Sequence, residues 1–149
     1  MVKHIWSILC RESIVDADTN NISANQLYET LQFNVTVDKA EYEKKKKLAG
    51  QFNFEIVSLL YRDKPGKIEE LDIELDILDP KDEKLGTALS KIEFKEKYKR
   101  VRNRIKFSTI ALTSSGTYYF KVYIKKNNKR ELVVAIPIDI QLTVNGKKV

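Results

Sequence analysis

The stretch SIVDADTNNIS contains the residues of this chain whose types and spacing most resemble a metal site. Asp16, Asp18 and Asn20 have the D-x-D-x-N spacing that opens a calcium loop, in which oxygen atoms at alternate positions bind the ion. The sixth position of such a loop is Gly and the twelfth is Glu, but here they are Asn21 and Leu27. Asp and Asn side chains also favour turns through bonds to nearby amides. We therefore interpret the stretch as a polar turn, and a weak metal-dependent enzyme remains an alternative function.

A second candidate site is a basic run, KEKYKRVRNRIK, in which cationic side chains recur at every second position. These side chains are Arg100, Arg102, Arg104 and Lys106. On a strand they project from one face about 7 Å apart, which suits contact with anions or with the phosphates of a single nucleic-acid strand. The favoured alternative is a solvated face that forms cross-strand ion pairs with Asp72, Glu74 and Asp76.

The sequence supports nucleophilic catalysis less than it supports either of these two candidate sites. The only His and the only Cys, His4 and Cys10, are six positions apart. On one strand they share a face but lie too far apart to touch. Cys10 is expected to be a small buried hydrophobe, and KPGK lacks the spacing of a phosphate-binding loop. We expect no catalytic residue, cofactor or metal ligand, and therefore no enzyme.

The composition favours one soluble domain over residues 1–149. The apolar fraction is 42%, the charged fraction is 32%, and 27 Lys and Arg exceed 21 Asp and Glu by a net charge of +6. No apolar run approaches the ~20 residues that cross a bilayer, so no membrane association is expected. The start of the chain lacks the features of a signal peptide, and a single Cys permits no internal disulfide. The predicted location is cytoplasmic.

Period-two alternation dominates the elements that must position these candidates. It is clearest in LDIELDIL, GTYYFKVYIKK and ELVVAIPIDIQLTV. Such alternation is typical of strands with one buried face. The expected core includes Leu71, Ile73, Leu75, Ile77, Tyr118, Phe120, Val122, Ile124, Leu132, Val134, Ile136, Ile138, Ile140, Leu142 and Val144. With turn signals at short intervals, the chain is predicted to be all-β, a single antiparallel sandwich of about seven to nine strands.

Local signals add detail to this prediction. Asn127 and Asn128 are suited to the left-handed backbone of a tight hairpin. Pro137 lacks an N–H, which predicts an edge or a bulge at that point. One short helix is expected near residues 39–49, with Asp38 as its N-cap and Gly50 just beyond its C-terminus.

Three segments carry a resemblance to a known family. They are HIWSILCRESIVDADTNNISANQLYETL, LDIELDILDPKDEKLG and SSGTYYFKVYI. Together they resemble an uncharacterised bacterial family of small immunoglobulin-like β-sandwich proteins, over most of the chain except the Lys-rich segment near residues 39 to 49. The resemblance implies an immunoglobulin-like fold, and it implies no activity or catalytic residue.

The function expected from these observations is a non-enzymatic binding or scaffold module with a protein partner. The alternative binding class is nucleic acid, contacted through the basic strand face. Immunoglobulin-like folds serve many unrelated functions, so the fold alone does not choose between these partners.

Overall fold

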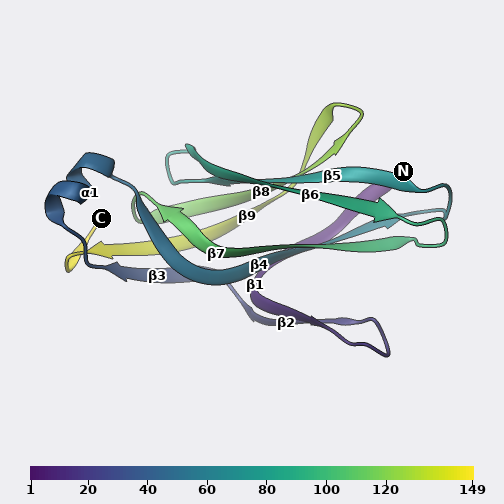
Figure 1. Cartoon of the computed structure of the whole chain (residues 1–149), viewed down its shortest axis with the longest axis horizontal. Coiled ribbons are helices and arrows are strands. Elements are labelled where there is room, and N and C mark those ends of the chain that lie inside the picture. Colours follow the sequence, from purple (N-terminus) through teal and green to yellow (C-terminus); the bar gives the residue numbers. More distant parts are fainter.

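The chain folds into ten strands and one short helix, in two sheets (Figure 1). The computed structural model describes all residues, Met1–Val149. The elements are β1 (Val2–Val15), β2 (Ile22–Leu27), β3 (Thr30–Val35), α1 (Lys39–Lys45), β4 (Leu48–Arg62), β5 (Glu69–Leu78), β6 (Lys84–Phe94), β7 (Arg100–Leu112), β8 (Gly116–Lys126), β9 (Lys129–Val144) and β10 (Lys147–Lys148). The prediction of a mostly β protein with one short helix is confirmed. The strand number exceeds the expected range because β10, which has two residues, also pairs.

The two sheets share no strand. The first has the order β2-β1-β4-β7, and the second has the order β10-β9-β8-β5-β6. All of their pairs are antiparallel except β3, which pairs with β9 in parallel from Thr30↔Asp139 to Val35↔Val144. The prediction of a wholly antiparallel sandwich is therefore wrong at β3. The chain crosses between the sheets just before this strand, so no hairpin sets the direction of β3.

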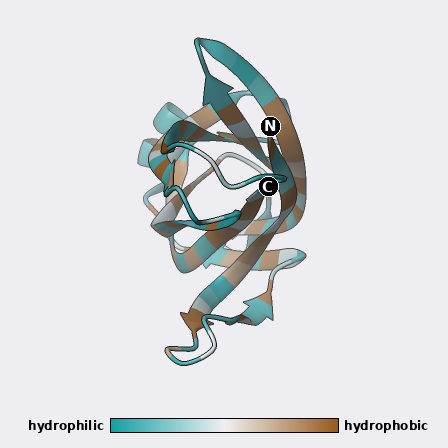
Figure 2. Ribbon diagram, turned by 90° about the vertical axis from the view of Figure 1, so that its right-hand side faces the viewer, coloured by the Kyte–Doolittle hydropathy of each residue, from teal (hydrophilic) through white to brown (hydrophobic).

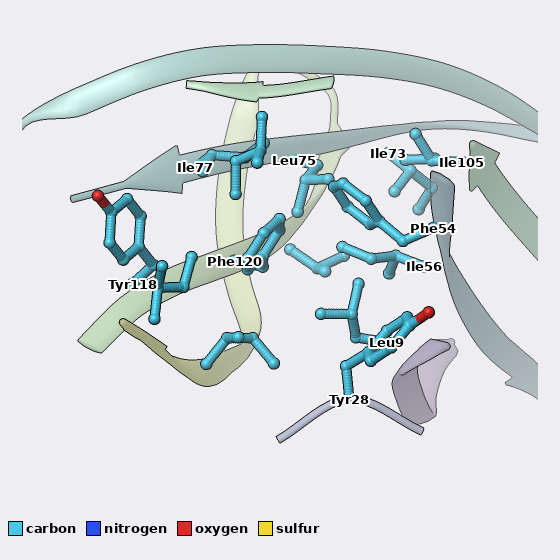
Figure 3. Close-up of a cluster of buried hydrophobic side chains, with 14 of the residues drawn as sticks. Leu9, Tyr28, Phe54, Ile56, Ile73, Leu75, Ile77, Ile105, Tyr118 and Phe120 are labelled. Atoms are coloured by element: carbon cyan, nitrogen blue, oxygen red, sulfur yellow. The ribbon is translucent and has the colours of Figure 1, made fainter. Parts of the chain in front are cut away.

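The alternating faces of the central strands meet in one core between the sheets (Figure 3). Phe120 of β8 and Phe54 of β4 meet edge to face, with their ring centroids 5.6 Å apart. Hydrophobic and hydrophilic segments alternate along the ribbons, as expected of strands with one buried face (Figure 2). The predicted inward faces of β5 and β8 are confirmed, since Ile73, Leu75 and Tyr118 are buried.

The expected unbroken alternation along β9 is wrong near its start. Leu132 is 50% exposed, although the pattern placed it in the core. The register between β8 and β9 shifts between Val122↔Val134 and Tyr123↔Leu132, so one extra residue of β9 interrupts the ladder. Such a bulge reverses which face the preceding side chains occupy.

The local turn and edge predictions agree with the structure. Asn127 and Asn128 both have positive φ, at 50° and 61°, in the two-residue connection between β8 and β9. Pro137 lies where β9 has β8 on one side and no strand on the other, because β3 begins to pair only at Asp139. The amide of Asp139 donates to the carbonyl of Glu29, on the β3 side, and amides two residues apart on a strand point the same way. The nitrogen of Pro137 therefore points away from β8, and its missing N–H removes no ladder hydrogen bond.

The predicted helix and its N-cap are confirmed, but its end is not where Gly50 placed it. The Asp38 side chain accepts a hydrogen bond from the amide of Glu41. The helix ends at Lys45, and its C-cap is Lys46, whose φ of 47° is left-handed and whose amide donates to the carbonyl of Tyr42. Gly50 lies in β4, where an added Cβ would come within 2.8 Å of Leu112, so close packing rather than a helix end requires Gly there. No helix in the structure combines the length and apolarity of a membrane span.

A buried tyrosine fixes the turn into β8. The Tyr118 hydroxyl donates to the carbonyl of Ser114 at 2.8 Å and accepts from the amide of Thr113 at 2.9 Å. The ring itself is fully buried and lies at one end of the core (Figure 3). One side chain thus fills the core and satisfies backbone groups of the turn that precedes its own strand.

Candidate functional site

The polar stretch at Asp16 is a turn that joins β1 to β2, as predicted. The Asp16 carboxylate accepts hydrogen bonds from the amides of Asp18 at 3.1 Å and Thr19 at 2.7 Å, and from the Thr19 hydroxyl at 2.8 Å. The Thr19 amide and hydroxyl lower the pKa of Asp16. The hydrogen bonds of this carboxylate are therefore made within its own loop. No group of three or more His, Cys, Asp and Glu side chains is placed to share a metal ion.

The four cations of β7 project from the outer face of the first sheet, the face turned away from the second sheet. They do not form a uniform ladder. Arg104 lies 3.6 Å from the buried carboxylate of Glu55, from Nε to Oε2, while Arg102 donates from Nη2 to Asn20 Oδ1 at 2.6 Å. Arg100 and Lys106 are exposed. The sequence therefore placed all four on one face correctly, but their immediate surroundings differ.

The acidic residues of β5 do not pair with this strand, so the expected cross-strand ion pairs are wrong. β5 belongs to the second sheet, and β7 belongs to the first. Instead, Arg130 of β9 contacts Glu74 and Asp76 at 2.5 Å each, and its guanidinium lies 3.5 Å from the centroid of the Tyr123 ring. Burial opposes ionisation of Asp76, but hydrogen bonds from Thr87 and Arg130 outweigh it and lower its pKa. Glu74 and Asp76 are thus paired within the second sheet, away from β7.

The β1–β2 hairpin reaches β7 because β1 separates from β4 halfway along its length. Their pairing ends at Cys10↔Glu55, and the rest of β1 pairs with β2 alone. At this point the Glu55 carboxylate accepts hydrogen bonds from the amide and the hydroxyl of Ser13, and so replaces the missing strand partner. Figure 1 shows the hairpin standing apart from the rest of the first sheet. Its tip, at Asn20, contacts Arg102 at the opposite edge of that sheet.

A groove of about 840 Å³ lies between the hairpin tip and the outer face of the first sheet. We call it the outer-face groove. The residues that line it include Trp6, Leu59, Lys95, Tyr98, Arg100 and Arg102. The strand register places Trp6, Leu59 and Arg102 in one row across β1, β4 and β7. The floor of the groove is therefore apolar over β1 and β4 and cationic over β7.

Buried Arg62 holds the loop that forms one wall of this groove. Its guanidinium donates to four backbone carbonyls, those of Lys67 and of three residues in the 95–99 loop. Its own amide donates to the carbonyl of Lys99 at 2.8 Å. Arg62 is thus a positioning residue, because the loop it fixes carries Lys95 and Tyr98.

His4 and Cys10 point to opposite sides of β1, so the expectation that they share a face is wrong. A register shift between His4 and Trp6 adds one residue and reverses the alternation. His4 Nε2 lies 2.8 Å from Ser7 Oγ, which lies 2.6 Å from Ser58 Oγ. Cys10 is fully buried, as predicted. Its pKa is raised mainly by burial and also by the nearby negative charge of Glu55.

The half-buried imidazole of His4 makes stability depend on pH. Burial lowers the pKa of His4 below its usual value, and a backbone hydrogen bond near Trp6 opposes this only partly. Below pH ~6.5 the unfolded chain then binds a proton more readily than the folded chain, so stability falls as the pH falls. We expect the melting temperature to drop between pH 7.5 and pH 5.5 by less in His4→Gln than in the wild type. An equal drop in both proteins would contradict this assignment.

The sequence identified the basic strand β7 and the β1–β2 turn, but it did not show that Asn20 of the turn contacts Arg102 of the strand. It also did not identify Trp6, Leu59 or Arg62 as parts of a site. The segment HIWSILCR has hydrophobic residues on both faces, and this was a signal of a second contact surface. The side chains that point away from the main core must pack against another part of the chain or against a partner. No known protein-family model and no curated protein sequence matches the chain, so the geometry of the groove carries the functional argument.

Proposed function

We propose that this protein is a non-enzymatic binding module whose binding surface is the outer-face groove. The observation that carries the proposal is the convergence of Trp6, the 95–99 loop and two cations of β7, Arg100 and Arg102, on one concave surface. A concave site with apolar walls and a few convergent charged groups is the usual form of a binding site. The only carboxylate in its lining is Glu93.

The scaffold that we propose is immunoglobulin-like, as the resemblance implies. Two observations support this. The chain order places β1, β4 and β7 in one sheet and β5, β8 and β9 in the other, with β3 added to the last long strand, as in immunoglobulin-like sandwiches. The bond from the Tyr118 hydroxyl to the carbonyl of Ser114 also matches the tyrosine corner of such domains.

The binding role predicts that capture of cellular ligands depends on the groove. Lys95→Glu with Arg100→Glu should lose most of the material that the immobilised wild-type protein retains from a lysate, because both side chains are exposed in the groove. Captured protein and captured nucleic acid are quantified separately, with and without nuclease.

The matched control is Lys44→Glu with Lys47→Glu. It makes the same change in net charge at exposed positions in and just after α1, which the groove does not include. We expect this variant to retain ligands as the wild type does. Equal retention by the groove variant and the wild type would overturn the proposed function.

A further inference from the structure

We infer that the ligand of the outer-face groove is single-stranded nucleic acid, bound by its phosphates along β7 and by a base on Trp6. This inference rests on the proposed function and adds the ligand class to it. DNA and RNA share the required chemistry, so the experiment tests both.

The phosphate contacts follow from three cations. Lys95, Arg100 and Arg102 line the groove, against the single carboxylate of Glu93. Arg102 uses Nη2 to hold Asn20, and a guanidinium has five N–H donors, so others remain free for a phosphate. Arg100 and Arg102 are alternate residues of one strand, about 7 Å apart, which matches the repeat of an extended single strand.

The base contact follows from the apolar part of the floor. Trp6 and Leu59 are neighbours across β1 and β4, and the row continues to Arg102 on β7. Tyr98 stands at the wall and is exposed. Each nucleotide of a single strand presents one anion and one flat apolar face, so it matches a cationic position beside an aromatic one.

Charge and shape favour a single strand over the other polyanions. A duplex keeps its base faces stacked and could offer only phosphates, which would leave Trp6 without a role. An acidic peptide could pair with the cations, but its carboxylates and its aromatic groups are on different residues. The remaining strong acidic cluster of the chain, on β5, lies in the other sheet and does not oppose a polyanion here.

The test uses the full chain and two readouts. Fluorescently labelled oligothymidylate and oligouridylate of about 15 nucleotides are titrated with protein, and anisotropy reports binding. Trp6 is the only tryptophan, so quenching of intrinsic fluorescence by the unlabelled oligonucleotide reports whether a base stacks in the groove. We expect both signals at low salt. Three phosphate contacts predict a slope of log affinity against log salt of about −2.

Two variants separate the phosphate contacts from the base contact. Lys95→Glu with Arg100→Glu should weaken binding more than tenfold and flatten the salt slope to about −0.7, since one groove cation remains. Trp6→Leu keeps an apolar side chain but removes the stacking surface, so it should weaken binding about tenfold with the slope unchanged. Lys44→Glu with Lys47→Glu should bind like the wild type.

The outcomes distinguish this inference from the proposed function. Binding without Trp6 quenching, or equal affinity for a duplex of the same length, would overturn the inference. So would no anisotropy change at tens of micromolar protein in low salt. If any of these three results is found while lysate capture still requires Lys95 and Arg100, the proposed binding role stands and its ligand is of another class.

Discussion

Replacement of Phe120 by Ala is expected to lower the free energy of unfolding by about 3–5 kcal/mol. Phe120 is 1% exposed and lies on β8, in the middle of the second sheet. Its ring meets Phe54, which also stacks on Phe107 of the first sheet at 4.9 Å. Truncation therefore leaves a cavity at the point where the two sheets pack together (Figure 3). Urea unfolding followed by circular dichroism measures the loss.

The matched control is Leu89→Ala. Leu89 is 74% exposed on the edge strand β6, so its truncation should change stability by less than about 0.5 kcal/mol. A loss below about 1 kcal/mol for Phe120→Ala would mean that Phe120 is not packed between the sheets. A similar loss for both variants would mean that the measurement does not distinguish buried from exposed positions.

Replacement of Arg62 by Met is expected to cost about 3 kcal/mol of stability and to weaken binding in the groove. Met has similar length but no donor, so the four carbonyls that Arg62 now satisfies lose their partner. Each buried acceptor left without a bond costs about 1–3 kcal/mol, and those near the surface regain water. Arg62 is 4% exposed and its guanidinium lies 5.3 Å from the Phe94 ring centroid, so the side chain also fills space.

Hydrogen exchange distinguishes the positioning role of Arg62 from a general loss of stability. In Arg62→Met the amide of Tyr98 should exchange faster at denaturant concentrations where the core of β8 remains protected. Arg62→Lys should fall between the wild type and Arg62→Met, because an ammonium has three donors on a single atom and cannot span all four carbonyls. Unchanged exchange in the 95–99 loop would contradict the positioning role, whatever the change in global stability.

Alternation and turn chemistry predicted most of the individual elements. The buried faces of β5 and β8, the Asn127–Asn128 hairpin and the Asp38 cap all depend on residues within one strand or one turn. Two of the failures occurred where one extra residue changed the register. Bulges moved His4 away from the face of Cys10 and moved Leu132 out of the core. A bulge depends on which strand lies alongside, and periodicity within one strand does not show this.

The sequence by itself determined the mostly β class, the buried faces of β5 and β8, the start of the helix after Asp38 and the presence of four cations on one face of β7, because each follows from contacts within a few residues. Only the tertiary structure decided that the acidic face of β5 lies in a different sheet from these cations. It alone also brought the hairpin tip at Asn20 to Arg102, which is 82 residues away in the chain. The physical reason is that the groove exists because β1 separates from β4. The hydrogen bond from Ser13 to the Glu55 carboxylate fixes the point of separation. That bond joins positions far apart in sequence, which neither composition nor spacing can reveal.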